Sequence, residues 1–227
     1  MRKMLFALVL MCWQSLVFGQ ETRKVDNFVS LYAGGNVKVE LIPSSTQKIE
    51  YTIIKGNESD LITDVSGGQL KIKIKQPMMG GSNAKAEVKV YYTKLEEIEA
   101  AAGANISGKT TIKSRNLEVS CSSGARINLN VESDVVKMVG SSGSSATLAG
   151  MVKEKLDITS SSGAKIDASS LESKKVDATA SSGSNIKVWA VESLDADASS
   201  GGKVGYKGDP KNKNFNTGMS GGNVSKI

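Results

Sequence analysis

The chain has 227 residues and a mass of 23.9 kDa, a length that fits one all-β domain or two small domains. It contains no histidine, which excludes imidazole metal ligands and every Ser-His or Cys-His catalytic pair. The net charge of +6 comes from 29 basic and 23 acidic residues without a basic stripe and interleaved aromatic residues, so the sequence does not favour a nucleic-acid partner.

Residues 1–19 predict an export signal that is removed from the mature protein. Two basic residues at positions 2 and 3 precede an apolar stretch that runs to Phe18. A membrane anchor is the alternative, but this stretch is shorter than the roughly 20 residues of a spanning helix. The small or tolerated residues at 17 and 19 favour cleavage before Gln20.

The two cysteines bear on the same question. Cys12 lies inside the expected signal, and Met11 before it is not the small residue that a lipoprotein signal needs. Cleavage would leave Cys121 alone, so we expect a mature protein without an internal disulfide. We therefore expect an exported protein of the periplasm, the outer cell surface or the extracellular space, stabilised by packing and backbone hydrogen bonds.

Residues 20–94 predict a β-rich half whose strands are rich in aliphatic residues, with clear alternation at 37–41 and 70–74. The candidate strands are Asn27–Tyr32, Asn36–Ile42, Lys48–Ile54, Leu61–Val65, Gln69–Lys75 and Ala86–Tyr92. Ser66-Gly67-Gly68 predicts a hairpin turn, and residues 77–83 predict a flexible loop. We expect this half to form the first coils of a repeat stack and to close its end.

A repeat of about twenty residues organises residues 95–227, and we expect residues 95–98 to form a strand that enters the first coil. Ser-Gly or Ala-Gly motifs place glycines at positions 103, 124, 143, 163, 183, 201 and 221. Five successive copies carry an aliphatic residue seven positions before the glycine: Leu117, Val136, Leu156, Val176 and Leu194. Five matched copies predict stacked units rather than a disordered Ser/Gly-rich tract.

The alternation within each copy has a period of two, which is typical of a strand with one buried face. The inward row of one copy reads Leu156, Ile158, Ser160, Ser162, Ala164, Ile166 and Ala168. A single copy cannot bury its inner face, so we expect the copies to stack as parallel strands about 4.8 Å apart. The predicted fold is an all-β, right-handed parallel β-helix, or β-solenoid, with coils of about 20 residues.

Serine occupies equivalent positions in successive copies and predicts ladders along the stack. The outward ladder comprises Ser122, Ser141, Ser161, Ser181 and Ser199. We expect the stacked hydroxyls to donate to and accept from one another along such ladders. Residues 207–214 contain Pro210, and we expect them to loop out before a last strand at Phe215.

Several short motifs follow one another in a recognisable order. They are Phe28-x-x-Leu31, Gly34-Gly35-Asn36-Val37-x-Val39-x-Leu41, Gly68-x-Leu70-x-Ile72, Val88-x-Val90-Tyr91, Leu95-Glu96-x-Ile98 and Gly103-Ala104-Asn105-Ile106. Across about residues 25–225 the chain resembles the GIN domain family, described as head domains of autotransporter adhesins of Gram-negative bacteria. The resemblance implies an exported β-helix-like head and brings no catalytic or ligand residue. Since the sequence shows no terminal translocator barrel, we do not expect the chain to transport itself.

Three features invite a chemical interpretation. Asp157, Asp177 and Asp195 share an outward register and could bind a hard cation through their oxygens, but nearby lysines favour a solvated face. Trp189 stands at an outward or corner position, where corner packing is favoured over a ligand-stacking surface. Cys121 lies in the inward row, where a buried inert thiol is expected. The sequence therefore predicts no catalytic, cofactor-binding or metal-binding residue, and it does not identify the binding residues.

Two classes of function remain open. We expect an exported, non-enzymatic, adhesin-like head that presents a rigid solenoid surface to a macromolecular or glycan partner. The alternatives are a carbohydrate-active β-helix enzyme and a purely structural spacer of the cell envelope. An enzyme would need paired carboxylates in a cleft, and the sequence offers no evident place for them.

Overall fold

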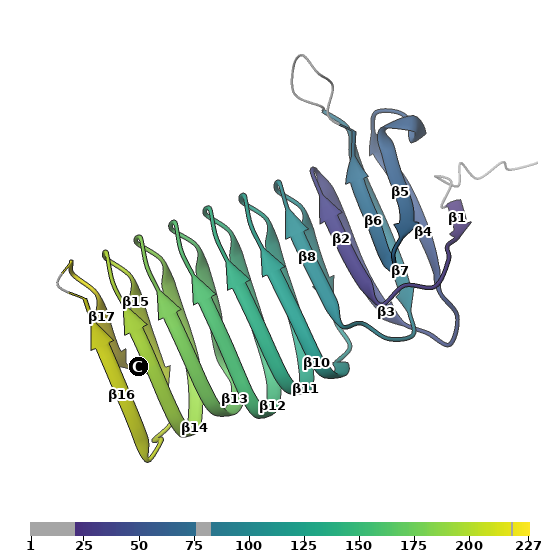
Figure 1. Cartoon of the computed structure of the whole chain (residues 1–227). Helices are drawn as coiled ribbons and strands as arrows, with labels where there is room; N and C mark the ends of the chain where they lie inside the picture. The colour runs from purple at the N-terminus through teal and green to yellow at the C-terminus, as the bar shows by residue number, and fades with distance from the viewer. Residues whose placement is uncertain (1–20, 76–82, 219) are drawn as a thin grey trace, which may run out of the picture.

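The computed structural model describes residues 21–75, 83–218 and 220–227. These residues form a β-solenoid of about six turns with stacked coils about 20 residues apart, which confirms the predicted fold. Their strands join into a single wound sheet around one continuous apolar core (Figure 1). The expected signal, its cleavage site before Gln20 and nearly all of the expected loop at 77–83 lie outside the described residues.

The repeat region gives each coil two flat sides. Its strands are β10 (Ile112–Cys121), β11 (Arg126–Gly140), β12 (Ser145–Ser160), β13 (Lys165–Ala180), β14 (Asn185–Ala198), β15 (Lys203–Lys207), β16 (Asn212–Thr217) and β17 (Asn223–Lys226). The first half of β14 pairs with β15 and its second half with β16, so one long strand serves both sides of the coil. Equivalent positions stack in parallel register, as in the row Ala146, Ile166 and Ile186.

The Ser-Ser-Gly segments form tight turns along one edge, the upper edge in Figure 1. In the turn at 161–164 the Ala164 amide donates to the Ser161 carbonyl at 3.1 Å, while Ser162 and Gly163 have φ values of +51° and +71°. Positive φ at both central residues is the mark of a type I′ turn. The Gly163 amide then donates to the Ser182 carbonyl of the next turn at 3.0 Å. The turns therefore stack through backbone hydrogen bonds.

These turns correct two predictions. Ser162 lies exposed at the tip of its turn, so its place in the inward row was wrong, because the turn itself uses two residues before the strand resumes at Ala164. The expected hydroxyl ladder is also wrong: among the described residues the hydroxyls of Ser122, Ser141, Ser161, Ser181 and Ser199 are not joined to one another, and these serines contact the neighbouring coil through their backbone amides, as from Ser181 to the Ser160 carbonyl at 3.0 Å. The buried serines bond to backbone as well. Ser144 donates to the Cys121 carbonyl at 2.7 Å, and Ser184 donates to the Ser160 carbonyl at 2.8 Å. Backbone carbonyls satisfy these hydroxyls because the carbonyls face them across neighbouring coils.

The N-terminal half contains coils in an order that differs from the sequence. Its strands are β2 (Ser30–Gly34), β3 (Val37–Pro43), β4 (Lys48–Lys55), β5 (Leu61–Ser66), β6 (Gln69–Ile74), β7 (Lys85–Tyr92), β8 (Glu97–Ala101) and β9 (Asn105–Gly108). The coil made by β2 and β3 lies between the coil of β6 and β7 and the coil of β8 and β9. Five predicted strands, from 36–42 onward, agree with the structure to within about one residue, and the 66–68 hairpin turn is confirmed. The first strand begins at Ser30 rather than Asn27, and the strand at the entry to the repeats is β8, which begins at Glu97 rather than at residue 95.

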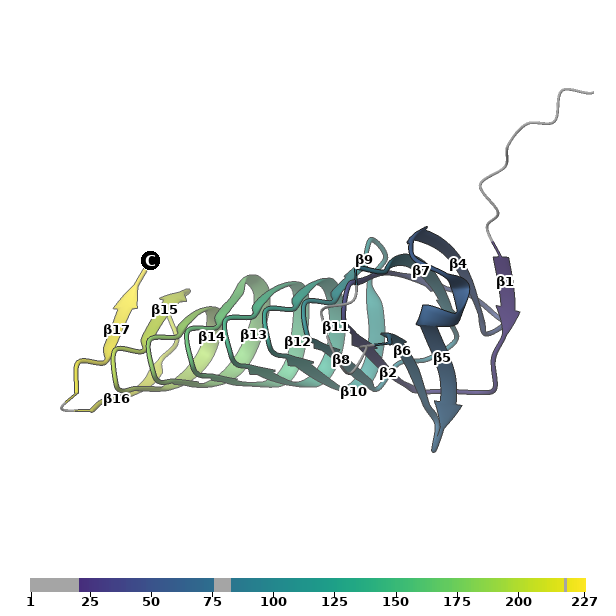
Figure 2. The same cartoon turned by 90° about the horizontal axis from the view of Figure 1, so that it is seen from above.

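Antiparallel strands close the N-terminal end of the solenoid (Figure 2). Strand β5 pairs with β6, β4 pairs with β7, and β1 (Glu21–Lys24) adds a short edge strand to β4. The sequence analysis missed β1 because its four residues contain no apolar alternation. This cap covers the first apolar layer of the stack, which is the role expected of a terminal unit.

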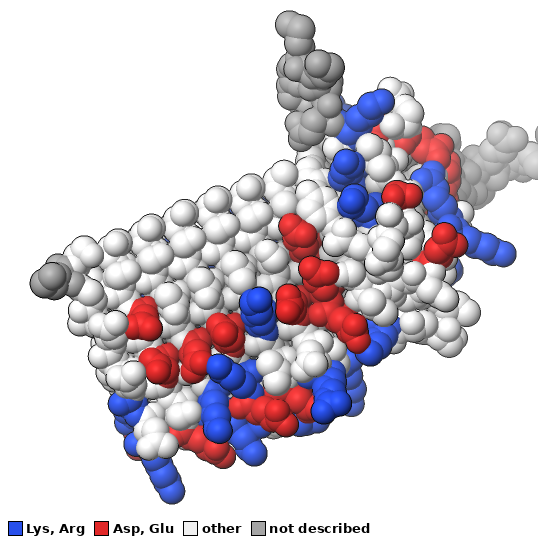
Figure 3. All heavy atoms as spheres, in the orientation of Figure 1, with Lys and Arg blue, Asp and Glu red and all other residues white. Residues whose placement is uncertain are grey.

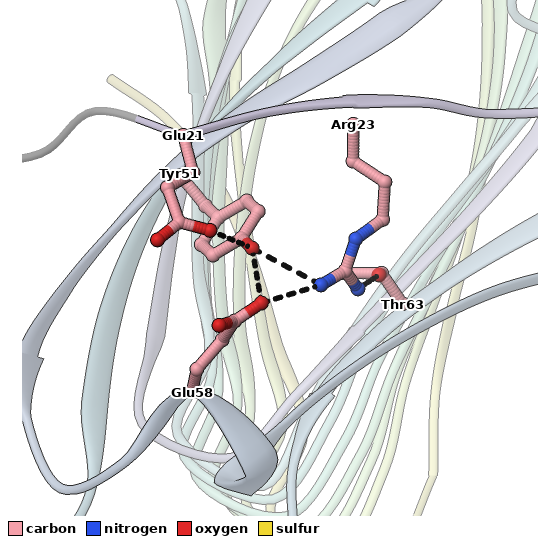
Figure 4. A network of polar contacts seen from close by, with 5 residues as sticks. All are labelled: Glu21, Arg23, Tyr51, Glu58 and Thr63. Atoms are coloured by element: carbon pink, nitrogen blue, oxygen red, sulfur yellow. Dashed lines mark hydrogen bonds and ion pairs between the residues drawn. The ribbon is translucent and has the colours of Figure 1, made fainter.

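A polar network holds β1 onto the cap (Figure 4). The Tyr51 hydroxyl lies 2.6 Å from Glu21 Oε2 and 2.5 Å from Glu58 Oε1, in the 3-10 helix η1 (Glu58–Asp60). Arg23 bonds to Glu58 at 3.0 Å and also donates to Thr63. Burial, and then the two carboxylates, raise the pKa of Tyr51, so its hydroxyl remains a donor at neutral pH.

The coil of β16 and β17, at the other end of the described solenoid, carries charged residues at two of its inward positions. Phe215 and Val224 continue the apolar inward rows of Ala196 and Val204, whereas Lys213 and Lys226 replace apolar residues in the rows of Leu194 and Tyr206. Both ammonium groups reach Asp209, at 3.1 and 3.6 Å. Inward-pointing charges discourage further strand pairing at a sheet edge. The loop before this coil is shorter than predicted, because β16 begins at Asn212 rather than at Phe215.

Candidate functional site

The solenoid presents two flat outer faces of opposite charge. We call the outer side of β8, β14 and the second halves of the strands between them the acidic face. Its outward carboxylates are Glu97, Glu99, Glu118, Asp157, Asp177, Asp195 and Asp197, and they outnumber the outward cations Lys137, Lys155 and Lys175. Figure 3 shows these charges gathered on one side, below the uncharged edge formed by the Ser-Ser-Gly turns. Burial and then the neighbouring Glu97 raise the pKa of Glu99.

The opposite side carries the reverse charge. We call the outer side of the first halves of β11, β12, β13 and β14, together with β15 and β17, the basic face. Its outward cations are Arg126, Lys165, Lys187, Lys203 and Lys207, and its outward carboxylates among these described strands are Asp167, Glu132 and Glu172, the last two at the corner row that also holds Trp189 and Lys207. The two sides of the wound sheet therefore enclose one core, and their outer surfaces carry an excess of opposite charge.

The three aspartates singled out by the sequence do share one outward row, between Lys137 and Asn214. Two of the three aspartates have separate side-chain partners. Lys155 Nζ lies 2.5 Å from Asp177, and the Asn214 amide lies 3.3 Å from both oxygens of Asp195. Within the described residues no three His, Cys, Asp or Glu side chains are grouped to hold a metal ion. The row thus has the features of a solvated, ion-paired face.

Trp189 lies at the corner where the basic face ends. Its ring is half-buried, Lys207 Nζ lies 3.9 Å from the ring centroid, and its edge approaches Gly208 closely. These contacts agree with the corner-packing interpretation. At the same edge Met151 is 45% exposed. Met151 stands opposite Glu132 and Glu172 in an outward row, and the next residue, Val152, takes the inward position instead.

Cys121 lies in the inward row and is 1% exposed. Burial raises the pKa of its thiol, and its Sγ lies 3.7 Å from the Ser145 carbonyl. A buried thiol with a raised pKa contributes little thiolate, the reactive form.

We expect Cys121 to resist a thiol-specific maleimide in native buffer and to react fully in 6 M guanidinium, because only unfolding brings its sulfur into solvent. Mass spectrometry of the labelled protein measures this difference. Rapid labelling of the folded protein, or a disulfide-linked dimer on a non-reducing gel, would contradict the buried position.

The basic face contains a pattern that the sequence analysis missed. The position two residues after each turn glycine holds Arg126, Ser145, Lys165, Asn185 and Lys203 in successive coils. Basic and neutral residues alternate along this row. The alternation hides the row in any pair of successive copies, and it becomes visible only when all copies are aligned on their glycines. In the described part of the chain no helix is long and apolar enough to cross a membrane.

The fold and its charged faces define a class of protein, a capped β-solenoid with flat polar surfaces. Residues 27–210 match the profile of the family described as "Putative auto-transporter adhesin, head GIN domain". The match spans most of the chain, so the protein belongs to the GIN-domain family, and the resemblance seen in the sequence is confirmed. The family implies an envelope or extracellular location.

Solved structures share the fold at low sequence identity. A putative adhesin from Bacteroides fragilis matches with a TM-score of 0.82 and 17% identity, covering 92% of this chain and 96% of that chain. A putative adhesin from Parabacteroides merdae matches with a TM-score of 0.70 and 17% identity, over 92% and 95%. A putative lipid binding protein from Parabacteroides distasonis matches with a TM-score of 0.67 and 19% identity, over 92% and 96%. No curated protein matches the sequence.

Proposed function

We propose that this chain is an exported, non-enzymatic binding protein that presents a rigid solenoid surface to a macromolecular or glycan partner in the periplasm or outside the cell. The observation that carries the proposal is the arrangement of charge. Charged side chains stand in straight rows on flat faces, with three aspartates in succession on one face and regularly spaced cations on the other, above a packed core. Such a surface offers many repeated polar contacts to an extended partner.

The same arrangement supports binding over catalysis. Turnover needs an acid or base positioned in a water-restricted pocket. The carboxylates of the acidic face lie on an open surface, and Asp177 is already paired with Lys155. The two largest depressions among the described residues are lined mainly by charged and polar side chains, such as Asp195 and Lys213 in one and Glu97 and Arg115 in the other, which also favours a polar partner over a lipid.

The test is a glycan and envelope-polymer binding array with the purified protein, followed by an assay for new reducing ends. We expect retention of at least one polymer without release of fragments. Heat-unfolded protein is the control for nonspecific adhesion. Fragment release that is lost in the Asp157→Asn, Asp177→Asn or Asp195→Asn variant would establish the enzyme alternative. Absence of binding to every polymer would leave the spacer role.

A further inference from the structure

The cations of the basic face are arranged with a period of two coils. The row after the turns runs across the stack as Lys38, Asn105, Arg126, Ser145, Lys165, Asn185, Lys203 and Asn223. Every second member is basic and every intervening member is a short neutral hydrogen-bonding side chain. Since neighbouring strands lie about 4.8 Å apart, the cations recur about every 9.6 Å.

The three central cations are available to a partner. Arg126, Lys165 and Lys203 are exposed, and none of them forms an ion pair among the described residues. Lys38, at the N-terminal end of the row, is instead paired with Glu87 at 3.3 Å. We call Arg126, Lys165 and Lys203 the cation row.

The surface is hollowed at the centre of this row. A depression of about 380 Å³ extends over β12, β13 and β14, and Lys165, Lys187 and Asn185 are among the residues that line it. Ser145 and Thr147 form part of its floor because their short side chains lie between longer neighbours. Asp167 also lines the depression and lies 4.0 Å from Lys187 Nζ, so an anionic group seated there would meet the unpaired ammonium of Lys165 first and neutral donors such as Asn185 beside it.

We propose that the basic face binds an extended anionic polysaccharide that carries one acidic group in every second sugar, lying across the coils along the cation row. This inference rests on the proposed function and assigns its face and ligand class. An extended chain of β-linked sugars advances by about one strand spacing per sugar, so a disaccharide spans two coils. Each acidic group then meets a cation, and each neutral sugar meets Ser145 or Asn185.

Two other polyanionic partners fit the spacing less well. Duplex DNA carries a phosphate about every 3.4 Å of its axis on each strand, far closer than the cations. A second copy of this chain would offer its acidic face, but Asp157, Asp177 and Asp195 stand on consecutive coils rather than on alternate ones. A polymer with one charge per disaccharide matches the period directly.

The experiment compares hyaluronan, with one carboxylate per disaccharide, against polygalacturonate, with one carboxylate per sugar, and neutral dextran. Titration calorimetry at low and at physiological salt measures each affinity. We expect the order hyaluronan, polygalacturonate, dextran, with affinity for hyaluronan falling as salt increases. The triple variant Arg126→Ser, Lys165→Ser, Lys203→Ser should bind hyaluronan at least about tenfold more weakly.

Two controls separate register from total charge. Replacing exposed Lys24, Lys55 and Lys85 by serine removes the same charge away from the row and should leave hyaluronan affinity within about twofold. Adding cations through Ser145→Lys and Asn185→Lys should shift the preference toward polygalacturonate, because every coil then carries a positive charge. Circular dichroism confirms that each variant is folded.

Equal loss in both triple variants, or stronger binding of polygalacturonate by the unchanged protein, would overturn the inference. Salt-sensitive dimers that disappear in the row variant would indicate self-association of the two faces and would also overturn it. Glycan binding that persists fully in the row variant would reject this face alone and leave the proposed function intact. Failure to bind any polymer would count against both.

Discussion

Replacing Ile166 with aspartate is expected to lower the free energy of unfolding by about 3–5 kcal/mol, because the change places an unpaired carboxylate in a packed interior. Ile166 is 2% exposed and stacks between Ala146 and Ile186 of the neighbouring coils. Its side chain also fills the space above Gly140, where an added Cβ would lie 3.0 Å from Ile166 Cδ1. Urea denaturation followed by circular dichroism measures the loss.

The adjacent residue supplies the control. Lys165 points outward from the same strand, so Lys165→Asp should change the free energy of unfolding by no more than about 0.5 kcal/mol. Equal losses for the two variants would mean that the inward and outward rows have been assigned to the wrong parity.

Replacing Gly150 with alanine is expected to cost about 3 kcal/mol or more, which is unusual for the addition of one methyl group. Gly150 has a φ of +115°, and a Cβ there would lie 2.1 Å from the Val131 carbonyl oxygen of the neighbouring coil. The clash involves backbone, so relieving it requires separation of two hydrogen-bonded strands. The same urea measurement applies.

Gly143 provides a matched comparison at the tip of a turn. Its φ is +67°, but an added Cβ would meet no atom within 4 Å. Gly143→Ala should therefore cost only about 1 kcal/mol, the conformational penalty of a left-handed residue. If Gly150→Ala were as mild as Gly143→Ala, the close approach of the coils at Gly150 would be incorrect.

Local pattern was sufficient to predict most of the fold. The two-residue alternation placed Leu156 and Ile166 correctly in the interior, because the side-chain period of a strand is fixed by its geometry. It failed at Ser162, where two successive left-handed residues interrupt the period. It could not reveal the position of the β2 coil, because strand stacking order depends on pairing between distant segments.

The candidate surface was predictable only in part. The aspartate row was visible in the sequence because three consecutive copies carry the same residue at the same offset. The cation row was not, because its members alternate with Ser145 and Asn185 and look unrelated within any single copy. The opposite sign of the two faces also depends on the chain folding back on itself, which brings residues about ten positions apart to opposite sides of a thin slab.

The displaced position of the β2 coil has a consequence for the time course of folding. From β10 onward each coil can form on the preceding one, about twenty residues back, a route of low contact order and therefore a fast one. The β2 segment instead finds one of its partners 67 residues later, at Glu97, so its two edges cannot both be covered until that segment is available. The closure of that long loop delays the N-terminal coils. The earliest part of the chain is thus expected to reach its native pairing late, and the regular coils provide the template on which it completes.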